Sequence, residues 1–185
     1  MNINQPKTHM MTCNTIAKSG FFLAALLIFT ACSDDDDEQS TPAPTQAQMI
    51  QQMIDEVRDV TSAFHDFEAG VQAGWSVPLS GCVAHPELGG MGYHYGRMEY
   101  FDGRINHLEP QVLLYEPKGD GEMEFVGVEY IIPFEILSED ADPPTLFYHE
   151  YHKNHMQEIW ALHVWTEREN PAGMFFDWNP NVSCE

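Results

Sequence analysis

One apolar stripe near the start of the chain limits what this sequence can fold into. Between residues 46 and 71, apolar side chains recur at alternating spacings of three and four, which is the period of one helix face. They are Ile50, Met53, Val57, Val60, Phe64, Phe67 and Val71. The stripe predicts a helix of about 25 residues, roughly 37 Å long. Three heptads lie at the lower limit for a coiled-coil seam, so packing on a sheet of the same domain is favoured.

Both ends of this helix have sequence signals. Thr45 and Gln48 have the spacing of a capping box, in which each side chain satisfies the other residue's backbone N–H. Gly70 and Gly74 supply the stop. These signals place the predicted helix between residues 46 and about 70.

From Trp75 onward the apolar period changes to two, which is typical of strands. Residues 111–116 and 124–132 predict a hairpin around the turn at 117–121. In the second strand, the face expected to be core consists of Val126, Val128, Tyr130 and Ile132. The other face carries an acid and consists of Phe125, Gly127, Glu129 and Ile131. Asp102-Gly103 predicts a further hairpin across residues 100–105. The sequence therefore predicts an α+β fold, with one long N-terminal helix packed on an antiparallel β-sheet with long loops.

The N-terminus has the features of a lipoprotein signal peptide over residues 1–31. Lys18 precedes the apolar run 21–30, which is too short to stay in a bilayer as a spanning helix. Phe29-Thr30-Ala31-Cys32 resembles the lipobox of bacterial lipoproteins, which implies that Cys32 is lipidated and becomes the first residue. The alternative is an ordinary secretory leader in which the cysteine occurs by chance.

An acidic, flexible tether is expected at residues 32–45, followed by a single globular domain at 46–185. Residues 33–38, Ser-Asp-Asp-Asp-Asp-Glu, cannot fold on themselves because their charges repel. They resemble the acidic export signal of surface lipoproteins in some Gram-negative bacteria, although a solvated spacer is the alternative. Together with Cys32, this predicts an outer-membrane lipid anchor and exposure at the cell surface.

The charge of the chain limits its partners. The formal net charge is −21, and loss of Lys7 and Lys18 with the leader takes it to −23. Such a surface repels phosphate backbones, so nucleic acid is excluded as a partner. A small ligand, a metal ion or a cationic partner remains compatible.

Two of the four cysteines are left for a disulfide. Cys13 leaves with the leader and Cys32 is assigned to the lipid, so Cys82 and Cys184 remain as a pair in an oxidising compartment. Their bond would hold the C-terminal tail near the glycine-rich stretch at 89–92. Metal binding by two free thiols is the weaker alternative, because neither cysteine has a Cys-x-x-Cys partner.

His94, Glu129 and His163 are the candidate site residues. Each falls in a strand-like segment, and two histidines with one carboxylate form the ligand set of many sites for divalent transition metals. The same set also serves general acid–base work. Their spacing in the chain does not force them together, so the alternative is two satisfied sheet histidines and a glutamate paired with arginine. The glycine-rich run before His94 either delivers it to a sheet or forms only a tight turn.

Other histidines and aromatic residues carry weaker signals. His149, His152 and His155 would share one face of a helix, and we expect a solvent-facing cluster that binds metal only adventitiously and has no role in the site. Several aromatic residues can line a cleft or fill the core, and core is favoured. They are Trp75, Trp160, Trp165, Trp178, Phe175 and Phe176. The chain has no nucleophile elbow, phosphate loop or dinucleotide fingerprint.

Several short motifs resemble those of a group of uncharacterised bacterial secreted and lipoprotein domains. They are Gly-Gly-Met-Gly-Tyr-His-Tyr at 89–95, Pro110-x-x-Leu113-x-Tyr115-Glu116, Val128-Glu129-Tyr130, Leu162-His163-Val164-Trp165 and Asn170-Pro171-x-Gly173. The resemblance covers about residues 60 to 184 and implies a single exported domain, but no reaction. We therefore expect an outer-membrane lipoprotein whose domain binds a small ligand or metal. A metal-dependent enzyme using the His/Glu/His site and a structural envelope protein with no ligand are the alternatives.

Overall fold

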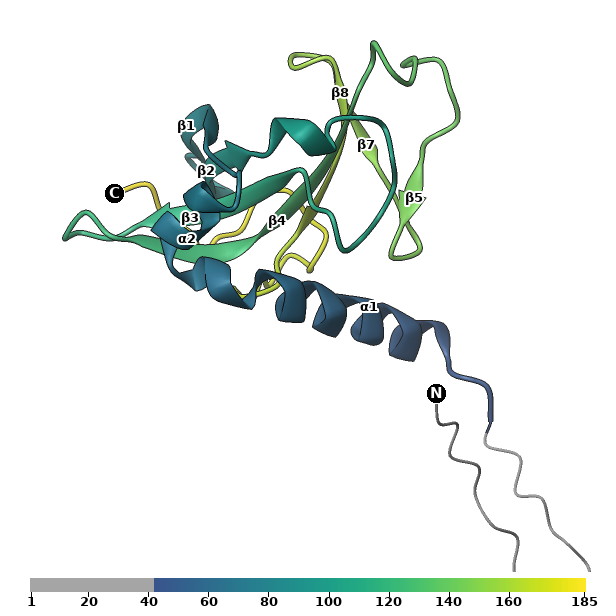
Figure 1. The fold of residues 1–185 in the computed structure, drawn as a ribbon, viewed down its shortest axis with the longest axis horizontal. Helices are drawn as coiled ribbons and strands as arrows, with labels where there is room; N and C mark the ends of the chain where they lie inside the picture. The colour runs from purple at the N-terminus through teal and green to yellow at the C-terminus, as the bar shows by residue number, and fades with distance from the viewer. Residues whose placement is uncertain (1–41) are drawn as a thin grey trace, which may run out of the picture. The chain divides into compact units, whose positions relative to one another are not determined.

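Six strands form one antiparallel sheet in the order β1-β2-β3-β4-β8-β7 (Figure 1). The computed structural model describes residues 42–185, so the signal peptide, Cys32 and the acidic run at 33–38 lie outside the described residues. The strands of the sheet are β1 (Val77–His85), β2 (Gly89–Gly96), β3 (Val112–Pro117), β4 (Met123–Pro133), β7 (His152–Asn154) and β8 (Ile159–Val164). Two short strands, β5 (Thr145–Leu146) and β6 (His149–Glu150), pair separately. The prediction of an α+β fold with an antiparallel sheet is confirmed.

The helical segment is interrupted, so the prediction of one continuous helix of about 25 residues is wrong. It consists of α1 (Gln46–Thr61), the 3₁₀ turn η1 (Ser62–His65) and α2 (Phe67–Gln72). Asp66 is extended, with a ψ of 110°, and its carboxylate accepts a hydrogen bond from the Glu68 N–H. It thereby caps a new helix, which is what aspartate does well at an N-terminus. Among residues 42–185, no helix is long and apolar enough to cross a membrane.

Signals at the ends of the helical segment were partly correct. The Gln48 side chain accepts from the Thr45 N–H at 2.8 Å, and the Thr45 hydroxyl accepts from the Gln48 N–H at 3.3 Å, so the capping box is confirmed. Gly70 lies inside α2 and is no stop. A Cβ there would come within 2.7 Å of the Tyr115 hydroxyl, so close packing explains this glycine.

The two faces of the sheet have separate cores. Helix α1 lies along one face of the sheet (Figure 1). Ile54 and Val57 of α1 belong to a large cluster on this face that includes Val128 and Leu162. The opposite face carries a smaller cluster, to which the C-terminal tail contributes Val182. Its other buried members are Val112, Leu114, Val126, Ile131 and Trp165.

The alternation predicted for β4 holds only in its second half. Val126 belongs to the smaller cluster and Phe125 to the cluster beneath α1, the reverse of the expectation. The register between β3 and β4 shifts between Leu114 and Tyr115, and such an irregularity exchanges the faces of the residues beyond it. From Val128 to Ile132 the predicted faces are correct, which leaves Glu129 on the face opposite α1.

Of the two predicted hairpins, one is confirmed and one is wrong. β3 and β4 pair antiparallel, as expected from their sequence. Asp102 and Gly103 instead lie in a loop that follows the 3₁₀ turn η2 (Met98–Tyr100). The Asp102 carboxylate accepts from the Arg104 N–H at 3.0 Å and turns the chain locally. The Arg97 N–H donates to the Gln111 carbonyl at 2.9 Å, so β2 and β3 join across the base of this loop.

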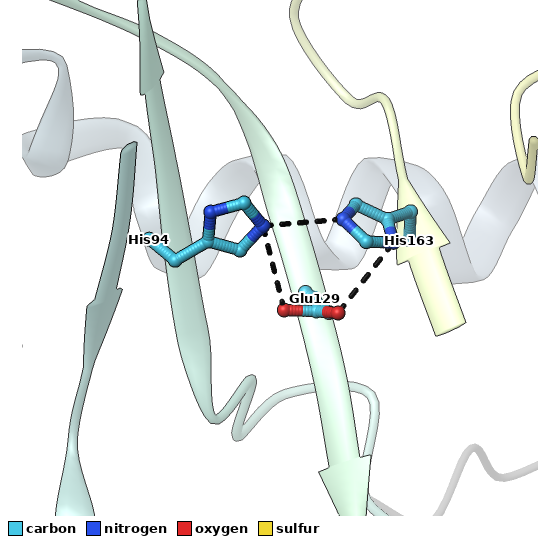
Figure 2. A group of neighbouring side chains, drawn as sticks. All are labelled: His94, Glu129 and His163. Carbon is cyan, nitrogen blue, oxygen red and sulfur yellow. Dashed lines mark hydrogen bonds and ion pairs between the residues drawn. The ribbon is translucent and has the colours of Figure 1, made fainter. Parts of the chain in front are cut away.

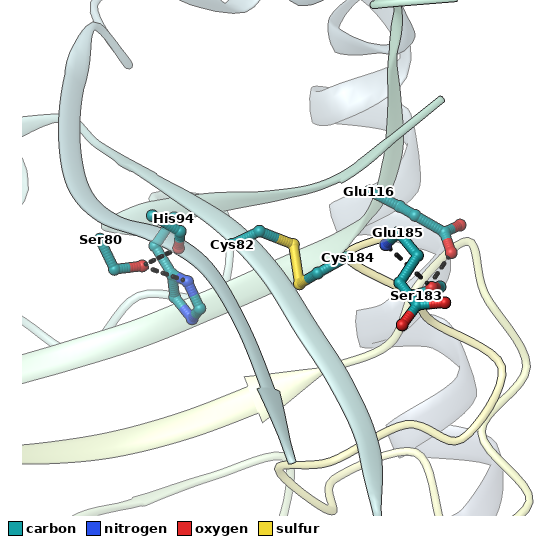
Figure 3. Close-up of a disulfide and its surroundings, with 8 residues drawn as sticks. Ser80, Cys82, His94, Glu116, Ser183, Cys184 and Glu185 are labelled. Atoms are coloured by element: carbon teal, nitrogen blue, oxygen red, sulfur yellow. Dashed lines mark hydrogen bonds between the residues drawn. A yellow bond between two sulfur atoms is a disulfide. The ribbon is translucent and has the colours of Figure 1, made fainter. Parts of the chain in front are cut away.

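Cys82 and Cys184 form a disulfide across 102 residues, as predicted (Figure 3). The tail before Cys184 lies against β2, where Gly90 and Asn179 exchange backbone hydrogen bonds of 3.0 Å each. A Cβ on Gly90 would come within 2.9 Å of the Val182 carbonyl oxygen. The glycine-rich stretch is therefore a strand that leaves room for the tail and brings His94 to the sheet, and the alternative of a tight turn is wrong.

Candidate metal centre

Three strands bring the candidate residues to the sheet face opposite α1. His94 lies on β2, Glu129 on β4 and His163 on β8. Glu129 and His163 are direct cross-strand partners, and His94 is reached across β3 (Figure 2). Tyr93 and Tyr95 pack against the cluster beneath α1, so strand alternation turns His94 to the other face.

The three side chains converge within hydrogen-bonding or ion-pair range. His94 Nε2 lies 3.4 Å from His163 Nε2 and 3.8 Å from Glu129 Oε2. His163 Nδ1 lies 3.5 Å from Glu129 Oε1. The exposed fractions of His94, Glu129 and His163 are 7%, 4% and 2%. An ionised carboxylate buried to this degree needs partners, and two histidines supply them here. The alternative, in which Glu129 pairs with an arginine, is wrong, because its neighbours are His94 and His163.

The partner of the outer nitrogen fixes the tautomer of His94. The Ser80 hydroxyl lies 2.9 Å from His94 Nδ1 and 2.9 Å from the Gly81 carbonyl oxygen (Figure 3). Its one hydrogen goes to the carbonyl, which can only accept, so Nδ1 of His94 is the donor to the Ser80 oxygen. In the neutral ring the lone pair of Nε2 then faces His163.

His163 is held by carboxylates on its other side. Its Nδ1 lies 3.4 Å from Asp177 Oδ1 as well as 3.5 Å from Glu129 Oε1, yet it makes no well-formed hydrogen bond to either. The two acids still favour an N–H at Nδ1, so the neutral ring also points a lone pair of Nε2 at His94. Two lone pairs facing each other repel, and a proton or a cation between them removes the conflict.

The pKa values of the two histidines shift in opposite directions. Burial lowers the pKa of His94 to about 4, with His163 adding to the shift and Glu129 opposing it. Burial also acts to lower the pKa of His163, but Glu129 and Asp177 outweigh it and raise that pKa. In the absence of a metal, these opposite shifts favour a proton on His163 over one on His94.

The geometry fits a transition metal. Two nitrogen atoms at bond lengths of about 2.0–2.1 Å from one tetrahedral Zn²⁺ ion lie about 3.3 Å apart. The Nε2 atoms of His94 and His163 are 3.4 Å apart, and the ligand atoms offered by all three residues lie within 4.8 Å of one another. Ser80 is hydrogen-bonded to Nδ1 of His94, and the Asp177 carboxylate lies 3.4 Å from Nδ1 of His163. A polar partner behind the ring is usual for metal-binding histidines.

Sequence reasoning missed three residues around this centre. Ser80 is paired with His94 in the sheet register, Asp177 bridges to His163, and His152 lies 3.3 Å from the other Asp177 oxygen. Burial acts to raise the pKa of Asp177, but the two histidines hold it below its usual value. The signal in the sequence that could have pointed to Asp177 is its place as an acid between Phe176 and Trp178. His149, His152 and His155 do not share a helix face, because they lie in and around β6 and β7. His155 is exposed as expected, whereas His152 pairs with Asp177 beside the site.

A cavity of about 510 Å³ opens beside the three residues. Its walls come from both ends of the sheet and from the tail, and include Leu79, Phe101, Met156 and Trp178. The expectation that aromatic residues fill the core is confirmed for Trp75, Trp160 and Trp165, which are each at most 5% exposed. Trp178 is the tryptophan that lines the cavity.

Comparisons with protein-family models, curated proteins and solved structures find no match. The resemblance to exported bacterial domains stays a prediction, and function has to be argued from the site itself.

Proposed function

We propose that the domain binds a divalent transition metal through His94, Glu129 and His163. The observation that carries this proposal is the pair of facing Nε2 atoms, 3.4 Å apart, with Glu129 Oε2 at 3.8 Å from one of them. A divalent ion between these atoms would relieve the conflict between the two lone pairs. It would also compensate the charge of Glu129, which is 4% exposed.

The donor set favours transition metals over Ca²⁺ and Mg²⁺. Calcium and magnesium take oxygen ligands, and Mg²⁺ keeps several waters. Two imidazoles with one carboxylate suit Zn²⁺, Fe²⁺ and their neighbours in the first transition row. The second ring nitrogen of His94 is hydrogen-bonded to Ser80, and that of His163 faces the Asp177 carboxylate at 3.4 Å, which supports ring orientations suited to binding through Nε2.

Metal-dependent catalysis is the second candidate, and the cavity favours it. Catalytic zinc sites keep three protein ligands and leave one position for water or substrate. The three candidate ligands border a space of about 510 Å³, which lies within the usual range of ligand sites. The same cavity weighs against a purely structural role, for which a closed core beside His94 would serve.

We also propose that the protein is a surface lipoprotein held by a lipid at Cys32. The lipobox-like run and the acidic residues after Cys32 support this location. The disulfide between Cys82 and Cys184 is consistent with an oxidising compartment outside the cytoplasm.

Metal content of the purified protein tests the main proposal. Protein stripped with chelator is titrated with Zn²⁺ and Co²⁺, and we expect one equivalent of either ion to bind. His94→Ala and His163→Ala should each abolish binding at micromolar metal. His155→Ala is the matched control, because that side chain is 71% exposed and pairs with Glu139 instead. Equal loss in all three variants, or no uptake by the parent protein, would reject the metal site.

A further inference from the structure

The cavity beside the proposed metal has an apolar wall built from distant parts of the chain. Leu79 and Val83 come from β1, Phe101 from the loop after η2, and Ile159 from β8. Leu79 is 37% exposed and Met156 is 92% exposed, so apolar surface continues to the rim. Apolar walls around a few polar groups are typical of sites that enclose most of a small molecule.

Charge gives anionic ligands no net attraction to this cavity, because the two positive charges of a divalent ion are balanced by two carboxylates. Among the described residues that line it, none is a lysine or an arginine. Two acids, Glu129 and Asp177, do line it, and the whole chain carries a formal charge of −21. A phosphate or carboxylate ligand would find no fixed cation other than the metal itself, and it would approach two carboxylates.

Cationic ligands are disfavoured for a different reason. Glu129 and Asp177 both lie within 3.5 Å of His163 Nδ1, so their charge is already directed at that ring. A divalent ion at the three ligands would add two positive charges where a ligand's donor atom has to arrive. The remaining polar wall groups include the side-chain amides of Asn154 and Gln157, which bind neutral groups well.

We infer that the cavity takes an uncharged, largely apolar small molecule that coordinates the metal through one neutral donor atom. This inference rests on the proposed metal site and adds the class of ligand. The apolar body would lie against Leu79, Phe101 and Ile159, and the donor atom would point toward His94, Glu129 and His163. The amides of Asn154 and Gln157 would supply the remaining hydrogen bonds.

Two imidazoles with the same donor test the inference. Co²⁺-loaded protein is titrated with imidazole and with 4-phenylimidazole, at a pH at which both are neutral, and the visible spectrum of the cobalt reports binding. Burial of the added phenyl ring should make 4-phenylimidazole bind at least about tenfold tighter. Acetate and phosphate, tested in the same way, should bind more weakly than imidazole. Equal affinity of the two imidazoles, or preference for either anion, would overturn the inference.

A matched pair of leucine variants separates the cavity from the rest of the surface. Leu79→Ala should weaken 4-phenylimidazole at least about threefold and leave imidazole unchanged, because the lost methyl groups contact only the apolar body. Leu108→Ala is the control, since Leu108 is 41% exposed and is absent from the residues that line the cavity. Both side chains are partly exposed, so neither truncation endangers the fold.

The outcomes distinguish failure of the metal site from failure of the ligand class. If Co²⁺ is not taken up, both proposals are wrong. If Co²⁺ binds at one equivalent and the phenyl ring gives no advantage, the metal site stands and the ligand class is wrong. Loss of the phenyl advantage in Leu108→Ala to the same extent as in Leu79→Ala would also contradict the placement of the ligand.

Discussion

Asp177 Oδ1 lies 3.4 Å from His163 Nδ1, although Asp177 belongs to the C-terminal tail and His163 to strand β8. The tail is held at two further points, by the bridge between Gly90 and Asn179 and by the disulfide at Cys184. The proposed metal centre therefore depends on a segment that is not part of the sheet. The position of His163 therefore depends on the contacts that hold the tail in place.

Asp177 is a positioning residue in the proposed metal site, and removing its charge should weaken metal binding. We expect Asp177→Asn to lower Zn²⁺ affinity by about 10–100-fold, as loss of a carboxylate behind a metal-binding histidine typically does. Competition with a chromophoric chelator measures the affinity. The variant should also lower the pKa of His163, which NMR of the metal-free protein reports and a purely structural effect would not shift.

The control for this prediction is Asp142→Asn, an exposed acid in the loop before β5. It removes the same charge without a neighbouring histidine. Equal affinity losses in the two variants would mean that only the overall charge matters, and the positioning role of Asp177 would be wrong.

Removing the disulfide should destabilise the domain and weaken the centre together. A bond that closes a loop of about 100 residues contributes up to about 4.7 kcal/mol in the chain-entropy model, and real bonds often give less. Cys82→Ser with Cys184→Ser should therefore lower Tm, measured by calorimetry. Because the tail carries Asp177, metal affinity should fall as well. Unchanged Tm under reducing and non-reducing conditions would contradict the first expectation, and unchanged affinity the second.

Much of the fold was readable from periodicity, and the exceptions have local causes. The change from period three-and-four to period two separated the helical segment from the sheet. The break at Asp66 was missed because the apolar spacing of three and four continues from the first helix into the second, although Asp66 caps a new helix. The faces of Phe125 and Val126 were exchanged because no sequence signal marks the register shift beside Tyr115.

The three candidate ligands were identified from residue type and strand alternation, without knowledge of the strand order. Their convergence depends on the order β2-β3-β4-β8, which alternation alone does not give. Asp177 and Ser80 were missed for the same reason, since the contacts that define them are made by the tail and by an irregular β1. The residues that contact the candidate ligands from behind are set by tertiary contacts, which a local sequence pattern does not show.

Gly90 should tolerate no side chain, because the tail lies directly on it. A Cβ there would meet the Val182 carbonyl oxygen at 2.9 Å, and backbone at that distance has to move. We expect Gly90→Ala to destabilise the domain by about 1–3 kcal/mol in urea unfolding. Gly119→Ala is the matched control, since a Cβ there would meet nothing within 4 Å. Equal stabilities of the two variants would contradict close packing of the tail on β2.

Anchoring is tested in cells. If Cys32 is lipidated, Cys32→Ser should release the protein from the membrane fraction and abolish incorporation of labelled fatty acid. Cys13→Ser, which changes a cysteine within the predicted leader, should leave labelling intact. Fatty acid entering the Cys32→Ser variant would show that the lipobox assignment is wrong.

Stability of the metal-free domain should depend on pH through His94. Its pKa is about 4 in the folded protein against 6.5 as the ordinary value, chiefly because of burial. Between these values the unfolded chain binds more protons at this residue than the folded chain does, so the free energy of unfolding falls as the pH is lowered. His163 has the opposite sign, because its raised pKa gives stability that is full below 6.5 and is lost as the pH rises through the folded value.

Urea unfolding of chelator-treated protein across this range measures the effect. The wild-type protein should lose stability steadily as the pH falls from 6.5 toward about 4, and His94→Gln should show a shallower slope in the same window. His155→Gln is the control, because His155 is largely exposed and its substitution should leave the slope unchanged. Identical slopes for wild type and His94→Gln would mean that His94 is not held neutral by its burial beside His163.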